Sequence, residues 1–148
     1  MHGNDTMTKE RLASYISLRV EVDNQLERLT RMRNEEKIPA MRESDGSQHS
    51  PGAGDRMERA IIRRMEYENR VIPQIEAALA EMEAIENAIY AVSDPMEREV
   101  LRLRYMEGDY IRHLPWRDVA LKLFGDDDKR HMVATYRLHT KALHNITS

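Results

Sequence analysis

Residues 116–146 read WRDVALKLFGDDDKRHMVATYRLHTKALHNI. Apolar side chains recur in the first nine residues with the spacing of one helix face: Trp116, Val119, Ala120, Leu123 and Phe124. Gly125 can end this helix in a left-handed conformation. Three aspartates follow, and then a longer segment that favours a helix from Lys129 to about Ile146. The pattern predicts a helix-turn-helix, whose second helix enters the major groove of DNA.

The second helix of this pair divides into an apolar side and a basic side. The apolar side faces the first helix and comprises Thr135, Leu138, Ala142 and Ile146. The basic side has positions at i, i+4, i+7 and i+11, namely Arg130, Ala134, Arg137 and Lys141, and residues 129–148 contain no acid. Because arginine can bridge guanine acceptors and lysine can neutralise phosphates, this stripe suits a DNA groove. We expect Lys129 and Lys141 to anchor phosphates.

Base readout is expected from Arg130, His131 and Arg137, and the small Ala134 allows close approach to a thymine methyl. The full set of predicted DNA-binding residues is Lys129, Arg130, His131, Ala134, Tyr136, Arg137 and Lys141.

A further helix precedes this pair. The segment Asp94-Pro95-Met96-Glu97 combines an N-cap aspartate, a proline at the first helical position and an acid in the first turn. The helix is expected to stop at Gly108, and residues 109–114 to form a short loop. Residues 95–148 are therefore predicted to be one helix-turn-helix domain.

Three segments of this domain, EVLRLRYMEG (99–108), WRDVA (116–120) and YRLHTKAL (136–143), carry a family resemblance. In order and spacing they resemble region four of sigma factors. They are closer still to phage and prophage regulators of the ArpU type, in which this module follows a long helical N-terminus. The resemblance covers about residues 95–146. It implies a phage- or prophage-encoded transcriptional regulator whose last helix reads promoter DNA through Arg130, His131, Ala134, Arg137 and Lys141.

Residues 8–92 are predicted to form a long antiparallel helical hairpin after a disordered segment at 1–7. The first helix spans 8 to about 36 and ends at Pro39. Its stripe has the heptad-like spacing of a coiled coil: Leu12, Tyr15, Val22, Leu26 and Leu29. Residues 43–54 are rich in turn formers, so we expect a flexible linker.

The second long helix is expected to begin at Asp55, which can cap it, and to kink or divide near Pro73. Its predicted stripe comprises Ile61, Met65, Ile72, Ile75, Leu79, Met82 and Ile89. The two stripes can pack within one chain, or between two chains in a homodimer; the pattern fits both.

Composition supports an all-α class and limits the kinds of site. Charged residues make up 33% and aromatic residues 5% of the chain, which contains only 6 Gly and 5 Pro; a β-rich fold normally needs more aromatic and turn-forming residues. The absence of Cys excludes disulfides and cysteine-ligated zinc. The longest apolar run is 88–92, whereas a membrane span needs about 20 residues. The first residues do not resemble a secretory signal, so we expect a cytoplasmic protein without a membrane partner.

No catalytic motif is present, neither Gly-x-Ser-x-Gly nor a glycine-rich phosphate loop, which indicates a protein that is not an enzyme and uses no cofactor. Residues 126–128 could bind a metal, but the favoured interpretation is that one aspartate caps the last helix and the others are solvated. The histidines lack metal-ligand spacing, so no metal site is predicted. His139 is expected to be a structural hydrogen-bonding residue, and Trp116 to pack in the core.

These observations predict a sequence-specific regulator that binds double-stranded DNA at a promoter, with RNA polymerase as a second candidate partner. The alternative is a helical adaptor that binds RNA polymerase or a phage-assembly partner without specific DNA binding. Its docking surface would be formed by Glu76, Glu81, Glu83 and Glu86. A phage DNA-packaging component is a third hypothesis, with DNA contact but no promoter preference.

Overall fold

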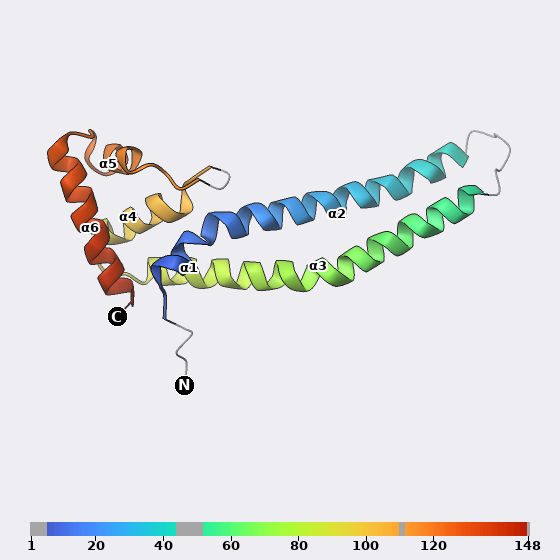
Figure 1. Cartoon of the computed structure of the whole chain (residues 1–148), viewed down its shortest axis with the longest axis horizontal. Coiled ribbons are helices and arrows are strands. Elements are labelled where there is room, and N and C mark those ends of the chain that lie inside the picture. The colour runs from blue at the N-terminus through green and yellow to red at the C-terminus, as the bar shows by residue number, and fades with distance from the viewer. Residues whose placement is uncertain (1–5, 44–51, 110–111, 148) are drawn as a thin grey trace. The chain divides into compact units, whose positions relative to one another are not determined.

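The computed structural model describes the backbone of residues 6–43, 52–109 and 112–147, and the side chains within 6–37, 54–109 and 112–146. The described residues form six helices and no strand (Figure 1), which confirms the all-α class. The helices are α1 (Lys9–Ala13), α2 (Tyr15–Glu43), α3 (Gly52–Tyr90), α4 (Pro95–Met106), α5 (Trp116–Phe124) and α6 (Lys129–Thr147). None of these helices, as far as the chain is described, combines the length and apolar character needed to cross a membrane.

The chain divides into two compact units. The first unit contains residues 1–20 and 79–148, and the second contains residues 21–78. The two long helices therefore each contribute one end to the first unit and their remaining length to the second. Sequence placed a domain boundary between residues 92 and 95, whereas the structure groups both sides of that point in one unit.

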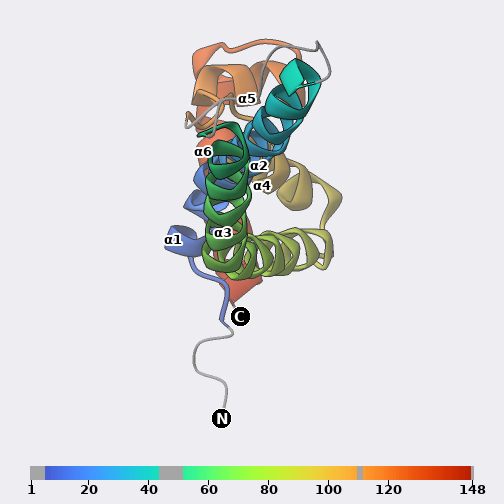
Figure 2. The ribbon, with the colours of Figure 1, turned by 90° about the vertical axis from the view of Figure 1, so that its right-hand side faces the viewer.

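A shared hydrophobic core explains this grouping. Fully buried side chains from both long-helix ends and from the C-terminal helices form one cluster, including Leu12, Ile16, Ile85, Ile89, Val100, Leu101 and Val119. Helices α4, α5 and α6 pack against one another in every pairing (Figure 1), and Figure 2 shows them turned by 90°. The C-terminal helices are thus built on the ends of α2 and α3.

Polar contacts reinforce the first unit. Arg11 makes a two-pronged contact with Glu81, with Nη2–Oε1 2.6 Å and Nε–Oε2 2.9 Å. Tyr15 donates to Glu86 at 2.9 Å, and burial together with this carboxylate raises the pKa of Tyr15 to about 12. Arg19 donates to the carbonyls of residues 106 and 108 at 2.9 and 2.7 Å. It thereby satisfies carbonyl groups at the end of α4 that lack helical partners.

Gly108 is required where the chain leaves α4. A Cβ atom at this position would lie 1.9 Å from the carbonyl oxygen of Arg112 and 2.6 Å from Cδ1 of Ile16. Both distances are far below contact, so a larger residue would displace the loop or the core. The glycine that sequence assigned as a helix stop also permits this close approach.

The second unit is an antiparallel pair of helix segments. Gln25 of α2 is hydrogen-bonded to Gln74 of α3 at 3.0 Å. Later in α2, Glu36 contacts Arg64, which comes earlier in α3, so the two segments run in opposite directions. Glu68 accepts from Arg33 at 3.1 Å and from Arg64 at 2.9 Å. The buried apolar residues of this unit are Val22, Leu29, Tyr67, Val71 and Ile75.

Several predicted helix boundaries are wrong. The predicted first long helix is divided at Ser14, which separates α1 from α2. Helix α2 then continues through Pro39 to Glu43. A proline removes only one donor from a long helix, which can continue past it. Similarly, α3 begins at Gly52, so that Asp55 lies in its first turn instead of capping it, and it runs through Pro73 as a single helix.

Two predicted flexible segments are only partly described. Residues 1–5 of the predicted disordered terminus and residues 44–51 of the predicted linker lie outside the described residues. Met7, however, is buried in the core cluster, which overturns the prediction of disorder at that residue. The described parts of the predicted linker, residue 43 and residues 52–54, are helical.

The predicted stripe of α3 mixes two faces of the helix. Ile75 and Ile89 are buried as expected, but Met65, Ile72 and Leu79 are exposed. Three residues that are absent from the predicted stripe are buried instead, namely Tyr67, Val71 and Ile85. On α2, Leu26 is exposed as well. Met65, Ile72 and Leu79 recur every seven positions, a spacing that resembles a buried stripe in the sequence.

We predict that Ile89→Ala lowers the free energy of unfolding by about 2–4 kcal/mol, because it removes fully buried methyl groups from the shared core. Urea denaturation followed by the fluorescence of Trp116, the chain's single tryptophan, measures this effect within the C-terminal helices. Leu26→Ala, at an exposed position, is the control and should change stability by less than about 0.5 kcal/mol. A Trp116 transition that Ile89→Ala leaves unmoved would show that the two regions unfold independently.

Candidate nucleic-acid interface

The turn between α5 and α6 begins as the sequence predicts. Gly125 adopts a left-handed conformation with φ 86°, and its N–H donates to the carbonyl of Leu121 at 2.9 Å. Residues with a Cβ rarely adopt this conformation, so glycine lets the chain reverse directly after α5.

Asp128 caps α6, which confirms that one aspartate of the turn serves this role. Its Oδ1 accepts from the backbone N–H of His131 at 2.9 Å, and its carbonyl accepts from the N–H of Met132 at 2.9 Å. The cap satisfies a helix amide that otherwise lacks a partner, and it places a negative charge at the positive end of the helix.

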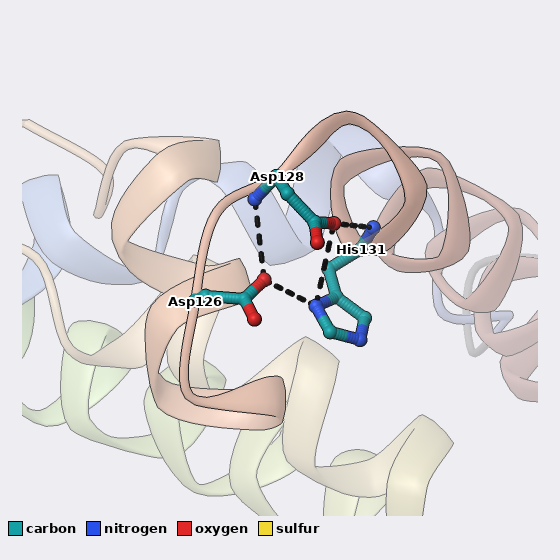
Figure 3. Close-up of side chains that lie close together, drawn as sticks. All are labelled: Asp126, Asp128 and His131. Carbon is teal, nitrogen blue, oxygen red and sulfur yellow. Dashed lines mark hydrogen bonds and ion pairs between the residues drawn. The ribbon is translucent and has the colours of Figure 1, made fainter.

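The other two aspartates of the turn are not merely solvated. Asp126 accepts from the backbone N–H of Asp128 at 3.2 Å and from Nδ1 of His131 (Figure 3). The His131 hydrogen bond is the main cause that lowers the pKa of the Asp126 carboxyl. Asp127 forms an ion pair with Arg117 of α5 at 2.6 Å. The aspartates therefore fix the turn through contacts with both flanking helices.

Oxygen and nitrogen atoms of Asp126, Asp128 and His131 that could ligate a metal lie within 4.8 Å of one another. Capping of α6 and the hydrogen bonds to His131 account for this arrangement (Figure 3). The His131 ring also stacks on Phe124, with centroids 4.9 Å apart and planes 8° from parallel. His131 thus belongs to the turn as much as to the surface of α6.

His139 holds α6 against its neighbours. Its side chain is buried, and Nε2 lies 2.7 Å from the hydroxyl of Tyr105 on α4. Its ring contacts Trp116 of α5 edge-on, with centroids 4.6 Å apart. The Arg104 guanidinium lies over the Trp116 ring, 4.4 Å from its centroid, and donates to the carbonyl of Leu114 at 2.7 Å. The expected structural role of His139 is confirmed, and Trp116 packs against the core.

The opposite side of α6 is exposed and basic. Side chains that the apolar face leaves in solvent include Lys129, Arg130, Val133, Tyr136, Arg137, Thr140 and Lys141. Within the described part of the chain, none of the four cations in this set forms an ion pair: Lys129, Arg130, Arg137 and Lys141. Because residues 129–147 include no acid, the helix cannot neutralise them locally.

Several arginines elsewhere in the first unit are engaged by neighbouring groups. Arg11, Arg102 and Arg117 pair with carboxylates, whereas Arg19 and Arg104 donate to backbone carbonyls. Lys9 of α1 and Lys122 of α5 are also exposed and form no ion pair with a described residue, so what distinguishes α6 is the grouping of four such cations on one acid-free helix.

The remaining predicted site residues occupy intermediate positions. Ala134 is half-buried beside the basic side chains, and Tyr136 is exposed but leans edge-on against Trp116, with centroids 5.3 Å apart. Val133 is an exposed apolar residue that sequence reasoning missed, although its place three residues after Arg130 puts it on the same face.

The four glutamates of the predicted adaptor surface differ in their surroundings. Glu81 and Glu86 are engaged by Arg11 and Tyr15 within the first unit, whereas Glu76 and Glu83 are exposed.

Comparison of the chain with models of known protein families gives no match, and neither a curated protein nor a solved structure matches it significantly.

Burial at His139 predicts a pH-dependent stability. Burial lowers the pKa of His139 from 6.5 to about 4, with Lys9 and Arg104 as further causes. In the unfolded chain this histidine takes up a proton near its ordinary pKa, while the folded protein resists protonation. Stability is therefore complete above the unfolded pKa and falls as the pH decreases toward the folded one.

We expect the free energy of unfolding to fall by about 1–2 kcal/mol from this residue between about pH 7.5 and about pH 5. Urea denaturation at the two pH values measures the loss. His139→Gln, which retains a hydrogen-bonding group for Tyr105 but does not titrate, should remove that component of the pH dependence. An identical loss in the variant would assign the pH dependence to other groups.

Proposed function

We propose that the protein is a sequence-specific DNA-binding transcriptional regulator that reads promoter DNA with α6. The observation that carries the proposal is the exposed, acid-free face of α6, whose four cations form no ion pair with described residues. A helix with this charge, capped at its N-terminus and braced by α5, fits the way a recognition helix meets the major groove. The resemblance of residues 95–146 to sigma region four and to ArpU-type regulators supports the same function.

Each side chain can be given a role from its position. Arg137 lies near the middle of the exposed face and is our candidate for bidentate contact with guanine, together with Arg130. Lys129 and Lys141, at opposite ends of the face, would neutralise phosphates. Val133 and Ala134 would allow close contact with thymine methyl groups. His131 would act mainly by holding the turn, since Asp126 and Phe124 already engage its ring.

A helical adaptor that binds only protein is the second candidate. Exposed Glu76 and Glu83 favour it, but the contacts of Glu81 and Glu86 leave a smaller acidic surface than the sequence suggested. Absence of DNA binding at low salt, together with a protein partner whose capture depends on Glu83, would favour this function over the regulator.

Arg137→Ala is expected to weaken specific DNA binding by about 1–3 kcal/mol, because it removes a contact to base edges. Lys141→Ala should weaken binding similarly across sequences and reduce the salt dependence by about one phosphate contact. Fluorescence anisotropy at two salt concentrations, with a fragment selected from random DNA, measures both effects.

Arg31→Ala is the matched control, because Arg31 is an exposed arginine that carries the same charge on a different helix, α2. It should leave the affinity for the selected fragment unchanged. Equal losses in Arg31→Ala and Arg137→Ala would indicate only a general charge effect, and an unchanged affinity in Arg137→Ala would contradict the assignment of α6 as the reading helix.

A further inference from the structure

Two arginines from different helices converge on one buried tyrosine in the second unit. Tyr67 of α3 is only 4% exposed. The Arg28 guanidinium of α2 lies over its ring, 4.8 Å from the centroid, and the Arg70 guanidinium of α3 lies 5.5 Å from it. A cation above an anchored ring is restricted in position, although this contact uses none of its N–H groups. Both arginines are exposed, so these N–H groups stay available to a ligand from solvent.

A row of arginines on α3 extends this arrangement. Arg59, Arg63 and Arg70 follow at i, i+4 and i+11, which places them on one face of the helix. Arg63 and Arg70 lie four residues before and three residues after Tyr67, so the row runs along the edge of the helix pair at which Arg28 also lies. A surface groove whose lining includes Arg59 and Arg63 lies in the same region. We call Arg28, Arg59, Arg63 and Arg70 the arginine flank.

The N–H groups of the arginine flank are almost unused within the described chain. Arg28, Arg63 and Arg70 form no hydrogen bond and no ion pair with another described residue. Arg59 donates only to the backbone carbonyl of Asp55, at 3.2 Å. Other arginines of the second unit are instead paired with glutamates. The flank therefore holds several guanidinium groups whose hydrogen-bonding capacity is directed at solvent.

Neighbouring carboxylates do not neutralise the arginine flank. Glu66 lies within the row, Glu35 lines the groove, and Asp55 lies four residues before Arg59. None of these three carboxylates forms an ion pair with a described residue. Four guanidinium groups beside three carboxylates leave the flank positive, so an anionic ligand is favoured.

Phosphate is the ligand group that fits these donors best. The planar guanidinium presents its N–H groups as a fork that matches two phosphate oxygens. Arg59 and Arg70 are eleven residues apart, so the row extends about 16 Å along α3. Phosphates of one strand of duplex DNA succeed one another every ~3.4 Å along its axis, which lets the row meet more than one of them. Carboxylates on a protein surface have no such regular repeat.

We propose that the arginine flank of the second unit binds the phosphate backbone of double-stranded DNA without sequence preference. The choice of DNA as the polyanion rests on the proposed function, whereas the flank itself includes no residue of α6. Phosphate contacts carry no sequence information, so the flank adds affinity for any duplex and leaves the preference for a selected fragment to α6.

Fluorescence anisotropy of the full chain, with the selected fragment and with a random-sequence duplex, tests the proposal. The association constant is followed from about 50 to about 200 mM salt. The slope of its logarithm against the logarithm of salt concentration should decrease by about one in Arg63→Gln and by about two when Arg70→Gln is added. Both fragments should lose affinity by the same factor. Circular dichroism should show unchanged helix content, because both residues are exposed.

Lys37→Gln is the matched control within the second unit. Lys37 is exposed, forms no ion pair with a described residue, and lies four residues after Arg33, which reaches Glu68. Arg28 and Arg33 are five residues apart, about 140° around the helix, so Lys37 lies on a different side of α2 from the flank. The control should leave the salt slope unchanged. A decrease equal to that of Arg63→Gln would overturn the proposal, because it would show only a general charge effect.

The flank and α6 can fail separately in this experiment. An unchanged affinity and slope in the double variant would overturn the proposal even if Arg137→Ala lowers the preference for the selected fragment. If the double variant weakens both fragments while Arg137→Ala leaves that preference unchanged, the flank is supported and the proposed role of α6 is contradicted. Polyglutamate at matched charge concentration separates DNA from an acidic protein: an equal loss of polyglutamate binding in the double variant would overturn the choice of DNA.

Discussion

The contact between His139 and Tyr105 sets the rotation of α6, and the exposed surface of the C-terminal helices follows from that rotation. His139 lies buried between α4 and α5, with its ring 2.7 Å from the Tyr105 hydroxyl and against the Trp116 ring. Successive residues of a helix are separated by about 100°. A shift of one residue in the phase of α6 would therefore remove this hydrogen bond and turn Arg130 or Arg137 toward the core. Burying an unpaired guanidinium costs several kcal/mol, so the observed phase is strongly preferred.

The charge on α6 is explained by how carboxylates are distributed in the first unit. Asp127 and Asp128 lie next to the basic face, yet one pairs with Arg117 and the other caps the helix. Further away, Glu81 and Glu99 pair with Arg11 and Arg102. An exposed ion pair adds little to stability, but each of these carboxylates already has a partner within the fold other than a cation of α6. The result is a cationic face whose field is screened mainly by salt and which can attract a polyanion.

Local signals in the sequence predicted the C-terminal helices well. Asp94 caps α4, Gly125 ends α5 and Asp128 caps α6, because each of these residues acts through bonds within a few positions of itself. The exposure of Arg137 and the burial of Thr135 followed from helical periodicity alone. The contacts of Arg19 with carbonyls of residues 106 and 108 could not be predicted, since they join positions 87 and 89 residues apart.

Periodicity failed in the long helices for a specific reason. Periodicity identifies rows of apolar residues but not the partner that packs on each row. Helix α3 has two such rows, which lie only a few residues apart in sequence. The buried row changes partner along the helix: Tyr67 and Val71 lie in the second unit, whereas Ile85 and Ile89 lie in the core with Leu101. A single predicted stripe therefore combined residues with three different environments. The same ambiguity hid the boundary between the units, because the transition from one partner to the next leaves no Gly or Pro signal in α3 near residue 79.

The exposed row on α3 has a different physical basis from the buried one. Side chains facing α2 follow steps of four residues, from Tyr67 to Val71 to Ile75, which keep to one side of a straight helix only for a short distance. The step from Met65 to Ile72 is seven, the repeat that faces a partner helix in a supercoil. Exposure of these residues contributes nothing to the stability of one chain, whereas burial against another helix would recover about 25 cal/mol for each Å² of apolar surface removed from water. The two rows of α3 therefore differ in their surroundings: the buried row stabilises the fold, and the exposed row is open to solvent.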